Sequence, residues 1–378
     1  MKILIFANIV HTNTLAGGDR IFIECANKWI QRNHEVTIVT NEVGKAYSLK
    51  GGIPPSSISV WSASWADAMG VYIAMTIKAV VGLVHGIFAP AQEVDIVFAS
   101  SFFAPDLLPA LLVKIKYPRA KLLVGTYLLT HKRWGTDYSA GKMKGLLFYF
   151  NQCFLFWAIH RYGGKILTAS AYDKTYLISS SGLDESSVLP FRGGVDCAYY
   201  ASVPSQPITY DAIFVGRFHP QKCISELIDI WSGVVRTIPK AKLALVGNGR
   251  LEKDLRAQVV KRGLEKNIDF LGPQEGVPKA ILLKSSKFFV TASRYDSGNI
   301  ALDEALACGT PGMVYHLPYL HYPKGVIKIP DGDQRLYIKI LTSAIQDDAL
   351  RARLASQALD FVASIDWGIT SEVMLQFA

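Results

Sequence analysis

The sequence has few cysteines, and their spacing shows no pairing. The five cysteines are Cys25, Cys153, Cys197, Cys223 and Cys308. Disulfide frameworks and zinc ribbons both need cysteines at short, regular spacings. The spacing therefore argues against both, and it predicts a protein of a reducing compartment, the cytoplasm.

We expect neither a secretory leader nor a membrane-spanning run. The N-terminal residues 1–10 hold one Lys and a short apolar run, but polar residues appear from Asn8 onward, where a signal peptide would stay apolar. We interpret this segment as a first β-strand. Residues 69–88 are long enough to cross a bilayer, but Lys78 and His85 interrupt them, which indicates an amphipathic or buried helix.

Acidic residues are nearly absent from one window, which runs from Lys114 to Lys165. It holds one acid, Asp137, and ten basic residues, so it accounts for the whole formal charge of +9. The basic residues are Lys114, Lys116, Arg119, Lys121, Lys132, Arg133, Lys142, Lys144, Arg161 and Lys165. No recognised nucleic-acid motif accompanies them, and aliphatic runs separate them, so nucleic acid is not the expected partner.

The same window contains an aromatic-rich apolar run, residues 145–159, with cations on both sides. Such a run is typical of a segment that lies on an anionic membrane surface. It is too short to span a bilayer, which needs about 20 apolar residues. The alternative is a helix buried in the domain core.

Both halves of the chain show the same alternation of strands and helices. Residues 1–40 run from strand to glycine-bearing loop, helix and strand, and the pattern recurs over 210–247. Strands rich in Val, Ile and Leu that alternate with helices predict an α/β fold with parallel sheets covered on both faces. Further strands are expected at 94–100, 121–127, 165–170, 268–272, 287–293 and 311–315.

The length of 378 residues predicts two domains. Ser and two prolines interrupt the pattern in 201–210, which we interpret as the linker. The expected domains are residues 1–200 and 208–356, and the apolar spacing of the C-terminal segment indicates one or two helices.

A polar loop followed by a short helix stands near the C-terminal end of the pattern. Ser297, Gly298 and Asn299 precede an apolar helical run that begins at Ile300 and should end near Gly309. The free N–H groups at such a helix start, together with the helix dipole, form an anion site.

Two acidic residues, Asp296 and Glu304, lie eight positions apart around this helix start. Carboxylates beside an anion site suit the hydroxyls of a sugar. The alternative is that Asp296 only caps the helix and Glu304 is an ordinary solvated helix residue.

Two cations follow the first strand of the second half. Arg217 comes directly after the strand, and Lys222 lies five residues later, near the start of the next helix. Ligands of parallel sheets bind beyond the carboxyl ends of the strands, so Arg217 and Lys222 could neutralise a diphosphate together. The alternative is a pair of solvated loop cations.

The first half offers weaker candidates. Gly17 and Gly18 open a helix at a point where the backbone can approach a ligand closely, although an ordinary turn explains them equally well. His131 follows the strand predicted at 121–127, where a base that acts on an acceptor could lie. A loop histidine without a role is the alternative.

Taken together, these motifs resemble the family-4 retaining glycosyltransferases, which have the GT-B fold. Each motif is weak or moderate alone, but six of them occur in the family's order. They are GGDRIFIECANKWIQRNHEVTIVT (17–40), VLPFRGGVD (188–196), VGRFHPQK (215–222), LVGNG (245–249), IDFLG (268–272) and YDSGNIALDEALACGTP (295–311).

The resemblance implies two Rossmann-like domains that face each other across a cleft, with the acceptor mainly on the first and the nucleotide sugar mainly on the second. It implies no cofactor and no required metal. The final helix, within 357–378, is expected to return to the first domain. The partners implied are a nucleotide-diphosphate sugar and a lipid-linked or glycan acceptor, at the inner face of a membrane.

The resemblance also assigns roles to residues. Asp296 would contact the sugar hydroxyls, Glu304 the ribose, and Arg217 and Lys222 the diphosphate. The expected catalytic set consists of Asp296, Arg217, Lys222 and His131. The remaining positions expected to line the donor site are Gly17, Gly18, Gly216, Gly247, Gly272, Ser297, Gly298, Asn299 and Ile300.

The sequence departs from the family pattern near these residues. Asp296 stands where Glu is usual, Gly298 and Asn299 where an aromatic residue and glycine are usual, and Cys223 where glycine is common. Asp303 replaces an apolar residue. We expect these changes to affect donor preference. An epimerase of similar fold and a non-catalytic sugar-nucleotide binder are the competing functions.

Overall fold

The structure, a computed structural model, describes residues 1–8, 17–61, 63–87, 93–127, 129, 142–294, 298–318 and 320–378. It divides into two compact units. Unit 1 comprises Met1–Gly193 with Trp367–Ala378, and unit 2 comprises Gly194–Asp366.

The boundaries of the units differ from the expected 200 and 357. The segment expected to end the first domain belongs to unit 2, because Tyr200 and Val203 are buried in its core. The helix that includes residue 357 also stays in unit 2, where Leu354, Ala358 and Val362 join the same core.

Unit 1 is built on a seven-stranded sheet in the order β3-β2-β1-β4-β5-β6-β7, and every strand pair in it is parallel. The strands are β1 (Lys2–Ala7), β2 (Glu35–Thr40), β3 (Ile58–Val60), β4 (Ile96–Ala99), β5 (Lys121–Thr126), β6 (Lys165–Thr168) and β7 (Val188–Pro190). The predicted strands at 94–100, 121–127 and 165–170 are confirmed, whereas the short β3 and β7 were not expected.

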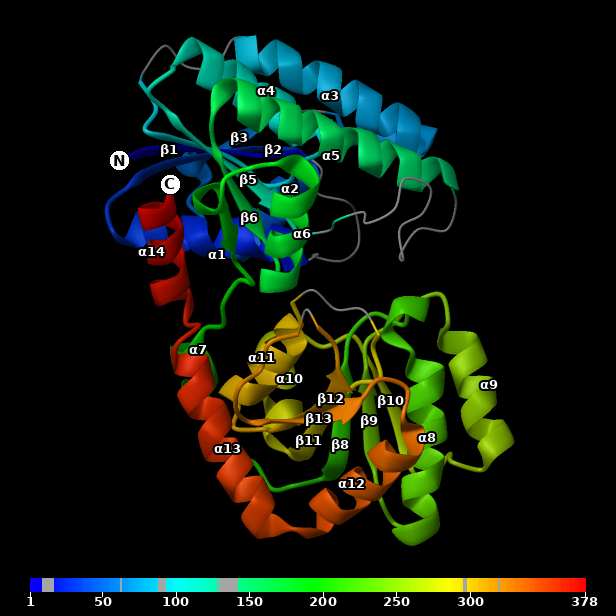
Figure 1. Cartoon of the computed structure of the whole chain (residues 1–378). Helices are drawn as coiled ribbons and strands as arrows, with labels where there is room; N and C mark the ends of the chain where they lie inside the picture. The colour runs from blue at the N-terminus through cyan, green and yellow to red at the C-terminus, as the bar shows by residue number, and fades with distance from the viewer. Residues whose placement is uncertain are drawn as a thin grey trace. The chain divides into compact units, whose positions relative to one another are not determined.

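Helices cover both faces of this sheet (Figure 1). The α-helices are α1 (Gly17–Gln31), α2 (Glu42–Lys50), α3 (Val71–Ile87), α4 (Ala104–Lys116), α5 (Lys142–Tyr162), α6 (Ala171–Ser181) and α14 (Trp367–Phe377). The 3-10 helices are η1 (Pro55–Ser57), η2 (Ser64–Met69) and η3 (Glu185–Ser187). Alternate residues of β1 enter two cores, since Ile3 and Ile5 pack with α1 while Leu4 and Phe6 pack with α4 and α5.

The last helix, α14, packs on α1 within unit 1 (Figure 1). The indole N–H of Trp29 donates to the Ser371 carbonyl at 3.1 Å, and Arg32 pairs with Glu372 at 2.6 Å. The C-terminal segment therefore returns to the first unit, as the resemblance implied.

Helix α5 contains the aromatic-rich run 145–159, and it is buried on one face. Leu155, Ala158 and Ile159 lie in the core of unit 1, whereas Phe150 and Trp157 are 60% and 52% exposed. Within the described residues, no helix is both long enough and apolar enough to cross a membrane.

Unit 2 has a six-stranded parallel sheet in the order β10-β9-β8-β11-β12-β13. The strands are β8 (Tyr210–Val215), β9 (Leu243–Val246), β10 (Ile268–Gly272), β11 (Ser286–Val290), β12 (Gly312–His316) and β13 (Val326–Pro330). The helices are α7 (Cys197–Ser202), η4 (Pro220–Lys222), α8 (Ile224–Thr237), α9 (Glu252–Arg262), α10 (Gly276–Lys284), α11 (Ile300–Ala307), α12 (Gln334–Gln346) and α13 (Asp348–Ala363). The predicted α/β fold with two parallel, Rossmann-like sheets is confirmed.

Each sheet contains one point where the order of its strands reverses. In unit 1 this switch point lies between β1 and β4, and in unit 2 it lies between β8 and β11. Open α/β sheets bind their ligands beyond the carboxyl ends of the strands at such a point. The loops that follow these four strands are therefore the places to search for a site.

Candidate functional site

The switch point of unit 2 brings together the two motifs singled out in the sequence. Arg217 follows β8, and the polar loop before α11 follows β11, the neighbouring strand. A hydrogen bond connects the two loops, because the Ser293 hydroxyl donates to the Gln221 carbonyl at 3.1 Å. Arg217, Lys222 and the start of α11 thus belong to one edge of one sheet.

Glycines at three neighbouring strand ends shape this edge. The Gly216 N–H donates to the Val246 carbonyl at 2.9 Å, and the Gly247 N–H donates to the Gly272 carbonyl at 2.8 Å. Gly247 has φ +138°, and a Cβ there would stand 2.0 Å from the Gly216 carbonyl oxygen. Glycine is therefore required at position 247 because two backbones approach closely there. This requirement holds whether or not Gly247 also contacts a ligand.

Arg217, Lys222 and a third cation, Arg250, lie close enough to His219 to affect its pKa. The pKa of His219 is lowered first by burial and then by the positive charges of Arg250, Arg217 and Lys222. The backbone explains the proximity, since the Phe218 N–H donates to the Asn248 carbonyl at 2.7 Å and so joins the two loops. Arg250 was not predicted, although it directly follows the glycine turn.

Cys223, the departure from the family pattern after Lys222, has a left-handed backbone with φ +48° and ψ +39°. Side chains disfavour that conformation and glycine does not, which explains why glycine is common at this position. Burial raises the pKa of the Cys223 thiol. The loop that carries Arg217 and Lys222, called the cation loop below, therefore keeps this turn although Cys223 disfavours it.

Helix α11 begins as predicted. The Asn299 side chain is the N-cap and accepts a hydrogen bond from the Leu302 N–H at 3.1 Å. The helix begins at Ile300 and ends at Ala307, with Gly309 in a left-handed conformation just beyond. The structure thus gives the capping role to Asn299.

Glu304 is buried in an ion pair. Its side chain is 2% exposed, and both of its carboxylate oxygens lie 2.7 Å from Nζ of Lys279, which is 12% exposed and belongs to α10. The alternative that Glu304 is a solvated helix residue is therefore wrong. Asp303, which stands where the family has an apolar residue, is buried as well. Lys279 was missed because no spacing in the sequence connects it with Glu304.

Arg294, in the loop that follows β11, is held by two ion pairs. Its guanidinium lies 3.2 Å from a Glu226 carboxylate oxygen and 3.8 Å from one of Asp331. The Tyr315 hydroxyl donates to the same Glu226 at 2.6 Å. Hydrogen bonding to Glu226 raises the pKa of Arg294, and the cluster joins this loop to the first turn of α8.

Three predicted site residues, His131, Asp296 and Ser297, lie outside the described residues. The other predicted residues of the second half, from Gly216 to Glu304, all lie in unit 2. Gly17 and Gly18 belong to unit 1, where they are the first residues of α1. A Cβ on Gly18 would stand 3.0 Å from the ring of Tyr127, so this glycine also permits close packing inside unit 1.

The switch point of unit 1 carries a buried acid. Asp106, in the first turn of α4, is fully buried and accepts hydrogen bonds from the Asn8 N–H at 2.6 Å and the Ser101 hydroxyl at 2.5 Å. Burial raises the pKa of Asp106 to about 7 against the opposing effect of these hydrogen bonds, and the nearby charge of Asp19 adds to the rise. Asn8 directly follows β1, so Asp106 fastens the start of the β1–α1 loop.

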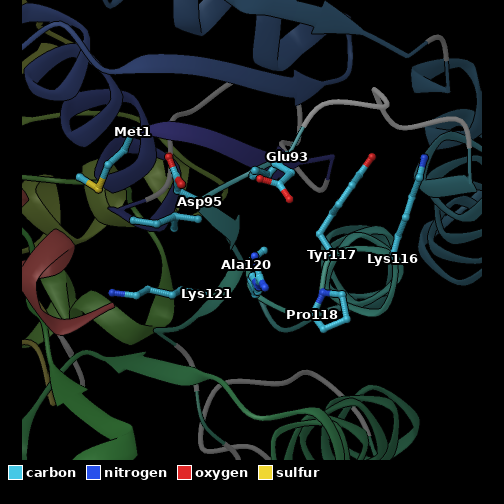
Figure 2. A pocket seen from close by; sticks show the side chains of 11 residues that line it. Met1, Glu93, Asp95, Lys116, Tyr117, Pro118, Ala120 and Lys121 are labelled. Atoms are coloured by element: carbon cyan, nitrogen blue, oxygen red, sulfur yellow. The ribbon is translucent and has the colours of Figure 1, made fainter.

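A hollow of about 550 Å³ lies at the opposite edge of this sheet, at the amino ends of β1, β4 and β5 (Figure 2). It is lined by residues of both charges, among them Glu93, Asp95, Lys116 and Lys121. Asp95 there accepts the Lys2 N–H at 2.7 Å. Because ligands of doubly wound sheets bind at the carboxyl edge, this hollow is not the predicted site.

The described residues contain no group of three His, Cys, Asp or Glu that could hold a metal ion.

Comparison with known proteins connects this geometry with a family. The sequence profile of the family described as Glycosyl transferases group 1 matches residues 204–359. Most of unit 2 therefore resembles this family. The cations after β8, the start of α11 and Glu304 all lie within the matched range.

Curated relatives match less than half of this chain, at low identity. A phosphatidyl-myo-inositol mannosyltransferase of Mycobacterium leprae is 28% identical over 173 residues, which is 43% of this chain and 45% of the relative. A GDP-mannose:cellobiosyl-diphosphopolyprenol alpha-mannosyltransferase of Xanthomonas campestris is 24% identical over 183 residues, 47% and 48% of the two chains. The chain spans about half the length of the curated relatives it matches.

Solved structures match the whole chain. HepE of Anabaena, in complex with UDP and glucose, covers 100% of this chain and 98% of its own, with a TM-score of 0.72 and 17% identity. A TarM mutant of S. aureus in complex with UDP covers 100% and 99%, with a TM-score of 0.76 and 10% identity. These likenesses show the fold, which is that of the GT-B glycosyltransferases.

Proposed function

We propose that this protein is a retaining glycosyltransferase that moves a hexose from a nucleotide-diphosphate sugar to a lipid-linked or glycan acceptor. One observation carries the proposal. Within the range that matches the group 1 family, Arg217 and Lys222 lie at the switch point of the sheet, in a loop hydrogen-bonded to the segment that leads into α11. Two cations at this position can neutralise the negative charge of a bound diphosphate.

The proposed division of roles follows from the charge that the reaction develops. Breaking the bond between sugar and phosphate leaves negative charge on the diphosphate and makes the sugar carbon resemble an oxocarbenium ion. Arg217, Lys222 and the N–H groups at the start of α11 stabilise the leaving diphosphate, in place of a metal. Asp296 contacts the sugar and Glu304 the ribose. In a retaining transfer the acceptor attacks from the face that the diphosphate leaves.

The relatives support the proposed donor and acceptor classes. The solved structure of HepE is a complex with UDP and glucose, which supports a nucleotide-diphosphate sugar as the donor. The names of the two mannosyltransferases specify a phosphatidylinositol and a diphosphopolyprenol, both of which carry a lipid. We assign His131 to the acceptor side as a base, to be tested by His131→Gln in the transfer assay.

A ligand screen tests the donor proposal. We expect UDP, GDP or ADP sugars to raise the melting temperature of the full chain, because a ligand that binds only the folded state stabilises it. Arg217→Ala should abolish the response. A full chain that responds to none of these nucleotides would contradict the proposal. Release of an altered free sugar without any acceptor would instead favour an epimerase, and binding without turnover a non-catalytic binder.

We propose that unit 1 contacts an anionic membrane surface with its outer helices, where the acceptor resides. Helix α3 exposes Ile73, Val80, Val84 and Ile87, which repeat at the period of one helix face. Helix α5 adds the exposed Phe150 and Trp157. The basic window supplies exposed cations at Lys116, Arg119 and Arg161. Aromatic and aliphatic side chains beside cations suit the boundary between anionic head groups and acyl chains.

Vesicle flotation tests this contact. The wild type should float with phosphatidylglycerol vesicles at low salt and much less with phosphatidylcholine vesicles. Replacing both Phe150 and Trp157 by Ser should reduce flotation strongly. Val260→Ser is the matched control, because Val260 is equally exposed but lies on α9 of unit 2. No flotation of the wild type at low salt would contradict the proposal.

A further inference from the structure

His219 stands in the cation loop, between Arg217 and Lys222 in the sequence. Its N–H donates to the Arg217 carbonyl at 2.8 Å, and its own carbonyl accepts the Lys222 N–H at 2.9 Å. Arg250 belongs to the loop after β9, which a backbone hydrogen bond of 2.7 Å joins to the cation loop. The backbone therefore keeps three positive side chains near one imidazole ring.

The ring of His219 has a defined hydrogen bond. Its Nδ1 accepts the Gln221 N–H at 3.4 Å, which makes His219 the N-cap of η4. A ring nitrogen that accepts a hydrogen bond carries no proton, so the neutral ring holds its proton on Nε2. A proton added at Nδ1 would end this bond, which is long and therefore weak. His219 can thus gain a charge at little cost to the turn.

The surroundings of His219 favour the neutral ring. Burial lowers its pKa first, and the positive charges of the three cations lower it further. Within the described part of the chain these are the charges that act on the ring, and none of them is a carboxylate. Glu226, the nearest acid along the sequence, is in an ion pair with Arg294 at 3.2 Å. Without a ligand, the cation loop therefore holds a neutral histidine at neutral pH.

A diphosphate bound to this loop would reverse the balance. It carries negative charge on both phosphates, which offsets the repulsion from the cations. Negative charge close to an imidazole favours its protonated form, and a ligand that displaces water strengthens the interaction. The group that the cations keep neutral in the free protein thus becomes a cation in the complex.

We propose that His219 takes up a proton when the diphosphate of the donor binds, and so adds a further positive charge to the site. This inference rests on the proposed function, because it takes a nucleotide-diphosphate sugar as the ligand of the cation loop. The proton comes from solvent and goes to Nδ1, and no bond of the donor forms or breaks in this step. The added charge lies where negative charge grows when the bond between sugar and phosphate breaks.

The test measures how donor affinity depends on pH. The probe is UDP-glucose, GDP-mannose or ADP-glucose, whichever the wild type binds most tightly, because the terminal phosphate of a free nucleoside diphosphate itself titrates near pH ~6. Wild-type affinity should fall about three- to tenfold from pH 5.5 to pH 8, since the complex holds a proton that the free protein lacks. His219→Asn should lose most of this fall, because Asn keeps an acceptor for the Gln221 N–H but cannot take up a proton.

A matched control and a second measurement complete the test. His34→Asn is the control, because burial also lowers the pKa of the half-buried His34, which belongs to unit 1. It should keep the wild-type dependence. Calorimetric titration in two buffers with different enthalpies of ionisation counts the protons directly. At about pH 6.5 we expect net uptake in the wild type and in His34→Asn, and almost none in His219→Asn. His219→Gln replaces His219→Asn if that variant does not unfold cooperatively.

The outcomes separate this inference from the proposed function. A wild type that binds none of the three nucleotide sugars would contradict the proposed function, and the inference with it. If the wild type binds a nucleotide sugar and a folded His219 variant takes up as many protons, the inference alone is overturned. Equal weakening of the variant at every pH, with an unchanged proton count, would show that His219 only caps η4.

Discussion

The two switch points share a topology but carry opposite chemistry. In unit 2 the loops beyond the strands present cations, since Arg217, Lys222 and Arg250 all lie near His219. In unit 1 the corresponding place holds a fully buried acid, Asp106, whose hydrogen bonds go to the protein's own loops. The sheet fixes where a site can lie, and the loop side chains decide what it can bind.

The comparison also shows a difference in how each loop is held. In unit 2, backbone hydrogen bonds between neighbouring loops hold the cation loop, and glycines such as Gly247 allow the close approach. In unit 1, a buried carboxylate holds the start of the β1–α1 loop through the Asn8 N–H. We therefore expect mutations to affect ligand binding in unit 2 and the pH dependence of stability in unit 1.

The largest effect is expected from Arg217→Ala. Removing a fixed cation that stabilises the leaving diphosphate should lower kcat/KM roughly 100-fold or more. Steady-state transfer of sugar to a lipid extract measures it. Arg262→Ala is the control, because Arg262 ends α9 at the opposite edge of the same unit and pairs with Asp229 at 2.7 Å. Equal activity of the two variants would contradict the assignment of the diphosphate to this edge.

A pair of glycine substitutions tests the backbone that holds the cation loop. Gly247→Ala should cost more than about 3 kcal/mol of unfolding free energy, because the new Cβ meets the Gly216 carbonyl at 2.0 Å and φ is +138°. Gly272→Ala has no heavy atom within 4 Å of its Cβ and φ +67°, so it should cost about 1 to 2 kcal/mol. Urea unfolding measures both. A cost of similar size for the two would show that the loop gives way easily.

Asp106→Asn tests the other half of the comparison. Between pH 4 and 7 the folded wild type holds a proton on Asp106 that the unfolded chain has released, so this group lowers the free energy of unfolding as pH rises. The Asn variant lacks that dependence. From pH 5 to 8 the wild type should therefore lose on the order of 2 kcal/mol relative to the variant. A difference that stays constant across this range would show that Asp106 ionises normally.

The sequence predicted the parts of the site that depend on local pattern. The N-cap and limits of α11, the strand before Arg217 and the turn at Gly247 follow from residue type and spacing, and the structure confirms them. Parallel sheets followed from apolar strands that alternate with helices. These features need only neighbours along the chain.

The missed features depend on contacts between distant segments. Lys279 meets Glu304 across 25 positions, and Asn8 meets Asp106 across 98. Neither partner stands in a recognisable motif, so nothing in the spacing identifies them. The burial of Glu304, which excludes the alternative of a solvated helix residue, likewise comes from contacts between distant segments such as the packing of α10 on α11. The expected end of the first domain, residue 200, differs from the observed unit boundary because α7 packs into the second core despite the prolines that follow it.

The smallest expected effect concerns Cys223, which keeps a left-handed turn that glycine would adopt more easily. Cys223→Gly and Cys223→Ala both remove the thiol, but only alanine retains a Cβ at φ +48°. The glycine variant should therefore be more stable than the alanine variant by about 1 kcal/mol, although glycine also gains freedom in the unfolded chain. Urea unfolding of the two variants side by side measures the difference. Equal stability would mean that the cation loop changes its backbone when the thiol is lost. Nucleotide affinity should then fall in the alanine variant, because Lys222 directly precedes the turn.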